Sequence, residues 1–561
     1  MKLNIKSSSS LLLGSMLLIG CATKKKEDGT RRDMQDQKRP NILFIMTDDH
    51  TTQAMSCYGS KLIETPSLDR IANEGARFNN CYVTNAICAP SRAVILTGKF
   101  SHVNGVKDNA DVFDGSQMTY PKLLRKSGYQ TAMIGKWHLG STPTGFDYYS
   151  VLPGQGNYYQ PDFIENGKRV KEDGYVTDII TRKAIDWLTF RDKTKPFAMI
   201  YQHKAPHRNW LAAPRHMGMY EDKVFPEPTT LTDNYTNRGA AAHQQEMEIK
   251  NHMWDAWDFK IATRQELEEF GRTHDLDVIK DAKQHDVDGA NKRDQDLEKL
   301  YRVYSRMTPE QKDIWEKAYA KRIKKFRETK WDSVSLLKYK YQLYMRDYLS
   351  TLASLDENVG KMLDYLEKTG ELDNTIVVYT SDQGFFLGEH GWFDKRMMYE
   401  QCYRMPLLIR YPKAIKPHTV SNALTMNVDF APTFLDYAGV KIPKEIQGKS
   451  MRPIFEQKPQ VEQNFRDATF YHYYEYPSWH SVKRHYGVRT QRYKLIHFYN
   501  DVDEWELYDL KNDPNELRNL YNDPNYSKEV VRLKEIMDKK IVEYNDPGAE
   551  NEAFDRSKIR H

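Results

Sequence analysis

Cysteine is scarce in this chain. Its 561 residues include only five cysteines, Cys21, Cys57, Cys81, Cys88 and Cys402. So few cysteines exclude a small scaffold held together by disulfides, because such folds need several closely spaced pairs. Cys21 and Cys88 stand in separate motifs, which leaves an odd number of others. One disulfide among Cys57, Cys81 and Cys402 is possible, but the sequence does not indicate which two would pair.

An excess of one charge sign is also missing. The chain has 83 Lys and Arg against 78 Asp and Glu, a net charge of +5. A dedicated nucleic-acid binder would carry a basic stripe, so we expect no nucleic-acid partner. A local cluster of Lys, Arg and His that binds an anionic substrate remains compatible with this balance. The length suffices for a large domain and a smaller one.

Long hydrophobic runs are absent except near the start. Lys2 and Lys6 precede the apolar run 11–19, which is too short to span a membrane and is typical of a secretory signal. The run ends in Leu-Ile-Gly-Cys21, which resembles a bacterial lipobox. This implies cleavage before Cys21 and acylation of its thiol, hence an exported lipoprotein anchored to a membrane, in the periplasm or at the cell surface. The alternative is a plain signal peptide with an incidental cysteine. Residues 22–39 are expected to be a solvated tether.

Two short apolar runs, 41–46 and 375–379, predict buried parallel strands. Further strands are expected at 131–134, 196–201 and 407–410. Leucines and other apolar residues between 343 and 366 lie on one face of a predicted helix, which Gly370 ends. Alternating helices and strands indicate an α/β fold with helices on both faces of a large sheet. Ligands of such sheets bind at the carboxyl ends of the strands.

Carboxylates follow both of these strands. Asp48 and Asp49 come after the first, and Asp382 and Gln383 after the second. A single Asp in such a place ordinarily caps a helix or forms a turn. Four oxygen donors from two strand ends, without Cys, suit Ca²⁺ or Mg²⁺ better than Zn²⁺, and loop-borne ligands favour Ca²⁺.

Composition divides the rest of the chain. Residues 232–331 are rich in charge and predict a mostly helical surface insertion, with helices near 296–306 and 309–328, whose charges form a solvated face. Beyond about residue 460, aromatic residues alternate with polar ones, and a last helix is expected at 527–544. We therefore expect a large α/β domain at 40–460, which contains the insertion, and a C-terminal α+β subdomain with an antiparallel sheet at 461–561.

The stretch Cys88-Ala89-Pro90-Ser91-Arg92 places a thiol beside a predicted helix start. Pro90 suits the first helical position, because its missing N–H would have no partner there. A helix N-terminus has free N–H groups and the positive end of the dipole, so it attracts anions. The plain alternative is a small buried Cys before an ordinary helix.

Three further motifs supply cations and imidazoles. Gly-Lys136-Trp-His138-Leu-Gly follows a predicted strand, so that both side chains would project to the same side. Ala-Pro-His207 follows another strand, and Lys395 comes soon after Asp382. Each motif alone has a structural explanation, as a packed His or a surface Lys.

In this order, the motifs resemble those of type I sulfatases, over about residues 40–520. The resemblance implies an alkaline-phosphatase-like fold, and Cys88 oxidised to formylglycine by a formylglycine-generating enzyme. It implies Ca²⁺ on Asp48, Asp49, Asp382, Gln383 and the modified Cys88, with Arg92 stabilising the modified residue. Gln383 replaces the Asn of many relatives and keeps an amide oxygen. Lys136, His138, His207 and Lys395 would contact sulfate, with His207 protonating the leaving oxygen and His138 taking a proton from the second hydroxyl of the aldehyde hydrate.

The stretches 100–106, 154–159 and 486–490 resemble those of bacterial sulfatases that remove 6-O-sulfate from N-acetylglucosamine in host glycans. An exo-acting enzyme on glycosaminoglycan or mucin is the resulting hypothesis. N-sulfoglucosamine and aryl sulfatases show similar stretches and remain the alternative. Trp479, His480 and His485 are candidate sugar-binding residues; the other interpretation is that the aromatic residues are core of the small sheet.

Two hypotheses depart further from a sulfatase. A phosphatase or phosphonate hydrolase of the same superfamily would need two metals and more His and Asp ligands, which are not found in the motifs. A non-catalytic glycan-binding lipoprotein would have no use for the maturation motif around Cys88.

Overall fold

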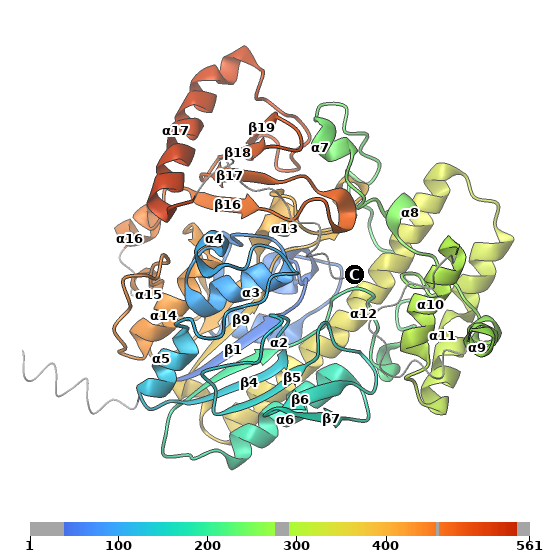
Figure 1. Cartoon of the computed structure of the whole chain (residues 1–561), viewed down its shortest axis with the longest axis horizontal. Helices are drawn as coiled ribbons and strands as arrows, with labels where there is room; N and C mark the ends of the chain where they lie inside the picture. The colour runs from blue at the N-terminus through green and yellow to red at the C-terminus, as the bar shows by residue number, and fades with distance from the viewer. Residues whose placement is uncertain (1–38, 275–290, 456–458, 547–561) are drawn as a thin grey trace, which may run out of the picture. The chain divides into compact units, whose positions relative to one another are not determined.

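A ten-stranded mixed sheet forms the centre of the fold (Figure 1). The computed structural model describes residues 39–274, 291–455 and 459–546. In spatial order the strands are β14 (Thr419–Ser421), β2 (Ala76–Phe78), β13 (Leu407–Arg410), β9 (Thr375–Ser381), β1 (Asn41–Thr47), β8 (Phe197–Gln202), β4 (Gln130–Lys136), β5 (Tyr148–Leu152), β6 (Asp162–Glu165) and β7 (Lys168–Lys171).

The five strands from β9 to β5 are parallel, as the apolar runs predict. β1 lies between β9 and β8, and Thr47 at its end is in register with Ser381. The carboxyl ends of β1 and β9, which carry the acidic motifs, therefore meet at one edge of the sheet. β13 runs antiparallel to β9, and β6 antiparallel to β5, so the sheet is mixed at its two sides.

Helices cover both faces of the sheet, because successive residues of a strand point to opposite sides. Leu43 and Ile45 pack with one group of helices, α2 (Pro66–Asn73), α6 (Val176–Phe190) and α12 (Ser333–Lys368). Ile42 and Phe44 pack with the other group, α3 (Cys88–Thr97), α5 (Tyr120–Lys126) and α14 (Phe430–Tyr437). The α/β architecture expected from the sequence is confirmed.

The charged insertion is mostly helical, with α8 (Ile249–His252), α9 (Arg264–Thr273), α10 (Lys292–Tyr304) and α11 (Pro309–Glu328) toward the right of Figure 1. Its first helix, α7 (Ala240–His243), lies apart from these, and the N–H of Ala240 donates to Glu504 Oε1 at 2.6 Å. The predicted helix at 309–328 is confirmed; Thr308 caps it, and Gln311 completes the capping box. The helix predicted at 296–306 is α10, which starts four residues earlier because Asn291 caps it.

The C-terminal segment forms a four-stranded antiparallel sheet beneath a long helix. The elements are β16 (Thr469–Tyr473), β17 (His485–Arg489), β18 (Tyr493–Phe498), β19 (Glu504–Asp509) and α17 (Ser527–Tyr544). Phe470 and Val488 of this sheet pack with Val94 of α3. The small sheet thus rests against the helix that begins at Cys88.

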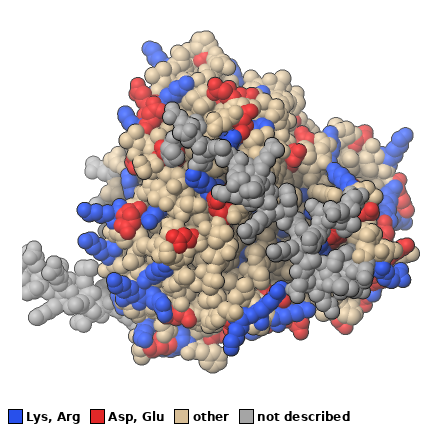
Figure 2. Space-filling model, viewed as in Figure 1, with Lys and Arg blue, Asp and Glu red and all other residues tan. Residues whose placement is uncertain are grey.

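Short elements complete the described chain. They are β3 (Cys81–Tyr82), β10 (Phe386–Leu387), β11 (Phe393–Asp394), β12 (Arg404–Met405), β15 (Thr425–Met426), α4 (Ser101–Asn104), α13 (Glu400–Tyr403), α15 (Arg452–Phe455) and α16 (Pro459–Asn464). Cys57, Cys81, Cys88 and Cys402 all have free thiols, so no disulfide joins them. No helix in the described part of the chain combines the length and apolar character that crossing a membrane requires. On the face shown in Figure 2, basic and acidic side chains are interspersed.

Candidate active site

The carboxylates that follow β1 and β9 converge, because the two strands are adjacent and parallel. One oxygen each of Asp48, Asp49 and Asp382 lie within 4.8 Å of one another. The backbone N–H of Asp49 donates to Asp382 Oδ1 at 3.1 Å, and Gln383 Nε2 donates to Asp49 Oδ1 at 2.6 Å. Asp49 adopts a left-handed backbone conformation with φ of 71°, which turns the chain out of the strand.

These oxygens fit a hard cation. Asp49 Oδ2 and Gln383 Oε1 are buried, and neither finds a hydrogen-bond partner among the described residues. Buried polar oxygens without partners are costly, so they favour a ligand that satisfies them. Burial raises the pKa of Asp49 to about 6, although the nearby Lys395 opposes this. Carboxylate and amide oxygens from loops are the donors that Ca²⁺ takes.

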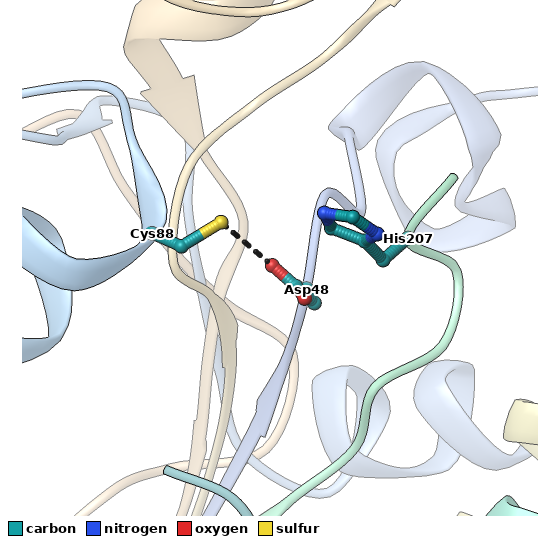
Figure 3. Close-up of side chains that lie close together, drawn as sticks. All are labelled: Asp48, Cys88 and His207. Carbon is teal, nitrogen blue, oxygen red and sulfur yellow. Dashed lines mark hydrogen bonds between the residues drawn. The ribbon is translucent and has the colours of Figure 1, made fainter. Parts of the chain in front are cut away.

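Cys88 lies next to these carboxylates. Its Sγ is 3.2 Å from Asp48 Oδ1, and Lys395 Nζ is 3.5 Å from Sγ. Figure 3 shows the side chains of Cys88 and His207 directed toward Asp48 from different segments. Burial raises the pKa of the Cys88 thiol to about 12. The unmodified thiol therefore stays protonated at neutral pH and is a poor nucleophile.

The helix that contains Cys88 begins earlier than the sequence predicts. α3 begins at Cys88 itself, with Ile87 as the capping residue, so that Pro90 is its third residue rather than its first. Pro is tolerated throughout the first turn, because the N–H groups there have no partner within the helix. Cys88 is thus inside the first turn, at the end where the helix attracts negative charge.

Arg92 does not line the cavity. Its Nε and Nη2 donate to Asp382 Oδ2 at 3.2 and 2.9 Å, and its Nη1 donates to the carbonyl of Lys136 and to Gln202 Oε1. The side chain is 1% exposed. The family resemblance assigns Arg92 to the modified cysteine; its direct contacts are with Asp382, with two strand ends and, at 3.6 Å, with Asp48 Oδ1, the oxygen next to Cys88 Sγ.

Lys136 and Lys395 each pair with a carboxylate. Lys136 Nζ contacts Asp48 Oδ2, and Lys395 Nζ is 2.5 Å from Asp49 Oδ1. Lys136 ends β4, where Gly135 lets this strand approach β8: an added Cβ would lie 1.7 Å from a backbone carbonyl oxygen. Both lysines are buried, so their charges act in a medium that screens them weakly.

The two histidines reach the same cavity. His138 has a φ of 53°, which turns it away from the strand path, and its Nδ1 is buried without a partner among the described residues. His207 Nδ1 is 2.7 Å from the carbonyl oxygen of Arg208. Since a carbonyl only accepts, that nitrogen carries the hydrogen, and Nε2 faces Asp49 Oδ2 at 4.0 Å. Burial, together with the surrounding lysines, holds the pKa of both histidines well below the usual value.

A cavity of about 530 Å³ opens above these groups. Cys88, His138, His207 and Lys395 line it together with residues from several other regions. Three of these are the loop at 155–158, the segment Asp394–Arg396, and the insertion, which contributes Trp257, Gln295, Glu298, Lys299, Arg302 and Val303. The insertion thus contributes to the cavity in addition to the solvated face expected from its charge. Leu300 and Tyr304 anchor α10 in the core, which turns the opposite side of the helix to the cavity.

Two of the three candidate sugar-binding residues line the cavity, and the third does not. Trp479 is 47% exposed and His480 is mostly buried, and both line the cavity. His480 Nε2 is 3.3 Å from Asp394 Oδ2. His485 does not line the cavity: it is fully buried in β17, bonded to the N–H of Met398 and to the carbonyl of Lys483. Its side chain points into the core of the small sheet, as the alternative interpretation of these aromatic residues expects.

Sequence reasoning missed several cavity residues. Lys204 and Arg208 flank the Ala-Pro-His207 motif, and Asp394 and Arg396 flank Lys395. Their positions next to motif residues were the available signal. Trp257 had no such signal, because only the packing of the insertion brings it to the cavity.

Comparison with known proteins gives the family. The sulfatase family model matches residues 40–440, and a model described as N-sulphoglucosamine sulphohydrolase, C-terminal, matches residues 388–543. The chain is 55% identical to an N-acetylglucosamine-6-O-sulfatase of Bacteroides thetaiotaomicron, over 97% of this chain and 92% of that protein. It is 29% identical to human N-acetylglucosamine-6-sulfatase over 74% of this chain and 64% of that protein.

A solved structure of a protein in complex with its substrate, D-glucosamine-2-N,6-O-disulfate, superposes with a TM-score of 0.85 at 55% identity. The match covers 92% of this chain and 100% of that one. The fold, the converging carboxylates and the family match agree, and the chain belongs to the sulfatase family of sulfuric ester hydrolases.

Proposed function

We propose that this enzyme removes 6-O-sulfate from N-acetylglucosamine in host glycans such as glycosaminoglycan or mucin. The observation that carries the proposal is the 55% identity, over 97% of the chain, to a protein named N-acetylglucosamine-6-O-sulfatase. The identity extends over the region of the large sheet, the insertion and the C-terminal segment, each of which contributes residues to the cavity lining. A substrate pocket built from three regions is expected to persist between relatives this similar.

We further propose a Ca²⁺ ion and a formylglycine at this site. Asp48, Asp49, Asp382 and Gln383 would hold the ion, because their oxygens converge and two of them lack partners within the described residues. Bound Ca²⁺ supplies positive charge for the sulfate oxygens and for the nucleophile. Oxidation of Cys88 by a formylglycine-generating enzyme supplies an aldehyde hydrate as nucleophile, where the protonated thiol would be inert.

The chain's own residues have separate tasks around the sulfate ester. Lys395, next to Cys88, would donate hydrogen bonds from its ammonium to the sulfate oxygens. Lys136, whose ammonium pairs with Asp48, adds positive charge to the site. The Arg208 carbonyl holds the Nδ1 hydrogen of His207. His207 Nε2 is therefore the atom through which a proton can pass to the leaving sugar oxygen. His138 is free at Nδ1 to accept a proton on the nucleophile's side.

The shape of the cavity supports an exo action on a terminal sugar. Trp257 and Trp479 form apolar walls, and Asp394, Arg396 and His480 offer polar groups to sugar hydroxyls. Removal of N-sulfate is a second candidate. One family model is described by that activity, and the solved relative binds a sugar that carries both sulfates.

Residues 1–38, including Cys21, lie outside the described residues. On the sequence motif we propose that the mature protein is exported and anchored through a lipid on Cys21, with a membrane and the formylglycine-generating enzyme as its partners.

The test measures free sulfate released by the matured enzyme from three monosaccharides. These are 6-O-sulfated N-acetylglucosamine, 2-O-sulfated uronic acid and N-sulfated glucosamine. We expect the first to react best, and a Cys88→Ala variant to release none. Reaction of the N-sulfated sugar alone would replace the substrate while keeping the class. Activity only on a sulfated oligosaccharide would refute the exo action. Mass spectrometry of the peptide around Cys88 checks the conversion to formylglycine.

A further inference from the structure

Besides Lys136 and Lys395, a third lysine belongs to the site, outside the motifs that predicted it. Lys204 follows β8 and comes three residues before His207, whose backbone N–H donates to the Lys204 carbonyl at 3.0 Å. The residue is 5% exposed and lines the cavity with Cys88, His138 and His207. The charge of Lys204 contributes to the lowered pKa of both histidines, and Asp49 and Cys88 in turn act on the charge of Lys204.

The partners of the three lysines differ. Lys136 contacts Asp48, and Lys395 contacts Asp49, so both ammonium groups already rest on carboxylates. Within residues 39–274, 291–455 and 459–546, no hydrogen bond or ion pair holds Lys204 Nζ. Its one close contact is with the face of the Tyr158 ring, 4.9 Å from the ring centroid.

A buried ammonium without an anion is unfavourable in the free enzyme. Burial accordingly lowers the pKa of Lys204 to about 8, with Asp49 opposing. An oxyanion that reached Lys204 in the cavity would complete an ion pair without breaking one, whereas Lys136 and Lys395 would have to share their charge with carboxylates. The net gain on binding is therefore larger at Lys204.

We propose that Lys204 is a substrate-binding residue whose ammonium group pairs with an oxygen of the sulfate group that is hydrolysed. The family match implies that the anion is a sulfate ester. The identity of the sugar that carries this sulfate rests on the proposed function. Lys204 adds a third cation to the sulfate contacts expected from Lys136 and Lys395. We expect this contact only in the complex, since the described part of the chain pairs no anion with this ammonium.

The experiment compares Lys204→Met and Lys204→Gln with a matched control, Lys183→Met. Lys183 is also a buried lysine, but it pairs with Glu165 and Glu172 at 2.8 Å and lies outside the cavity lining. Calorimetry with sodium sulfate on the matured, Ca²⁺-loaded enzyme gives the Kd of inorganic sulfate. Steady-state kinetics on 6-O-sulfated N-acetylglucosamine gives KM and kcat, and thermal unfolding gives Tm.

We expect both Lys204 variants to weaken sulfate binding about 10-fold to 100-fold, the range of a charge-assisted hydrogen bond. KM should rise by a similar factor. Lys204→Met should keep or raise the Tm of the free enzyme, since it removes an unpaired buried charge. Lys183→Met should show the reverse pattern, with a lower Tm and unchanged Kd and KM.

Two results would overturn the proposal. One is a Kd of inorganic sulfate within twofold of wild type in both Lys204 variants. The other is an unchanged Kd of inorganic sulfate together with a rise in KM for 2-N,6-O-disulfated glucosamine alone. That result would assign Lys204 to the second sulfate of the disulfated sugar. Calorimetry needs no sugar, so an enzyme inactive on the 6-O-sulfated sugar would refute the proposed substrate and still leave Lys204 tested.

Discussion

Arg92→Met tests whether Arg92 supports the carboxylate cluster rather than the reacting group. Arg92 makes two hydrogen bonds to Asp382 Oδ2, at 3.2 and 2.9 Å, and both side chains are almost fully buried. Met fills a similar volume but leaves the carboxylate without its cation. Breaking one side of a buried ion pair costs about 3–5 kcal/mol.

This cost converts into a measurable change of Tm. Unfolding entropy is about 2.1 cal/mol/K per residue, or about 1 kcal/mol/K for a unit of roughly 500 residues. The Tm of Arg92→Met in chelator should therefore fall by about 3–5 °C. Ca²⁺ should restore part of the loss, because it neutralises the same carboxylates. Arg125→Met is the control, since its pair with Asp147 is exposed and worth less than about 1 kcal/mol.

A double-mutant cycle separates the pair from its surroundings. Asp382→Asn together with Arg92→Met should be less destabilised than the sum of the single variants by about 1–3 kcal/mol. A supporting role of Arg92 in the carboxylate cluster is refuted if Arg92→Met leaves the Tm within 1 °C of wild type in chelator while abolishing turnover. That result would move the action of Arg92 to the nucleophile, where the family resemblance alone places it.

Three further predictions follow from the site and the N-terminal motif. Exhaustive chelation should abolish sulfate release, and Ca²⁺ should restore it, because the oxygens of Asp48, Asp49 and Asp382 lie within 4.8 Å of one another and would share one cation; full activity in chelator would contradict this. Trp479→Ala should raise KM for 6-O-sulfated N-acetylglucosamine roughly threefold to thirtyfold with little change in Tm, since the ring is 47% exposed at the cavity; an unchanged KM would remove it from the sugar site. Cys21→Ala should release the protein from membranes with kcat/KM unchanged, and equal membrane partitioning of variant and wild type would refute the lipid anchor.

Local patterns predicted the elements that carry the chemistry. The apolar runs before Asp48 and Asp382 gave strands in the expected places, and the helices at 309–328 and 527–544 were predicted to the residue. Such elements are decided by short-range periodicity and by caps such as Thr308. Boundaries failed where a cap lay further upstream, as with Asn291, and where the first turn of α3 included Cys88.

Roles within the site were harder to assign. Arg92 ends the Cys88 motif, and Lys204 directly precedes the Ala-Pro-His207 motif. The sequence does not show which of these two cations already pairs with a carboxylate of the protein. Packing makes that difference: Arg92 turns toward Asp382 between strand ends, and Lys204 turns into the cavity. His485 and Trp479 belong to one aromatic stretch, yet His485 lies in β17, whose residues are all buried, and Trp479 lies in a short turn that leaves it 47% exposed.

The sequence by itself determined the α/β class, the acidic strand ends and the sulfatase motifs, because each depends on residues close together in the chain. Only the tertiary structure decided which side chains share the cavity. The charge of the insertion predicts a solvated face, but burial of Leu300 and Tyr304 also turns Lys299 and Arg302 toward the cavity. Such contacts arise between residues hundreds of positions apart, and their geometry follows from the packing of whole helices and sheets, which no local pattern encodes.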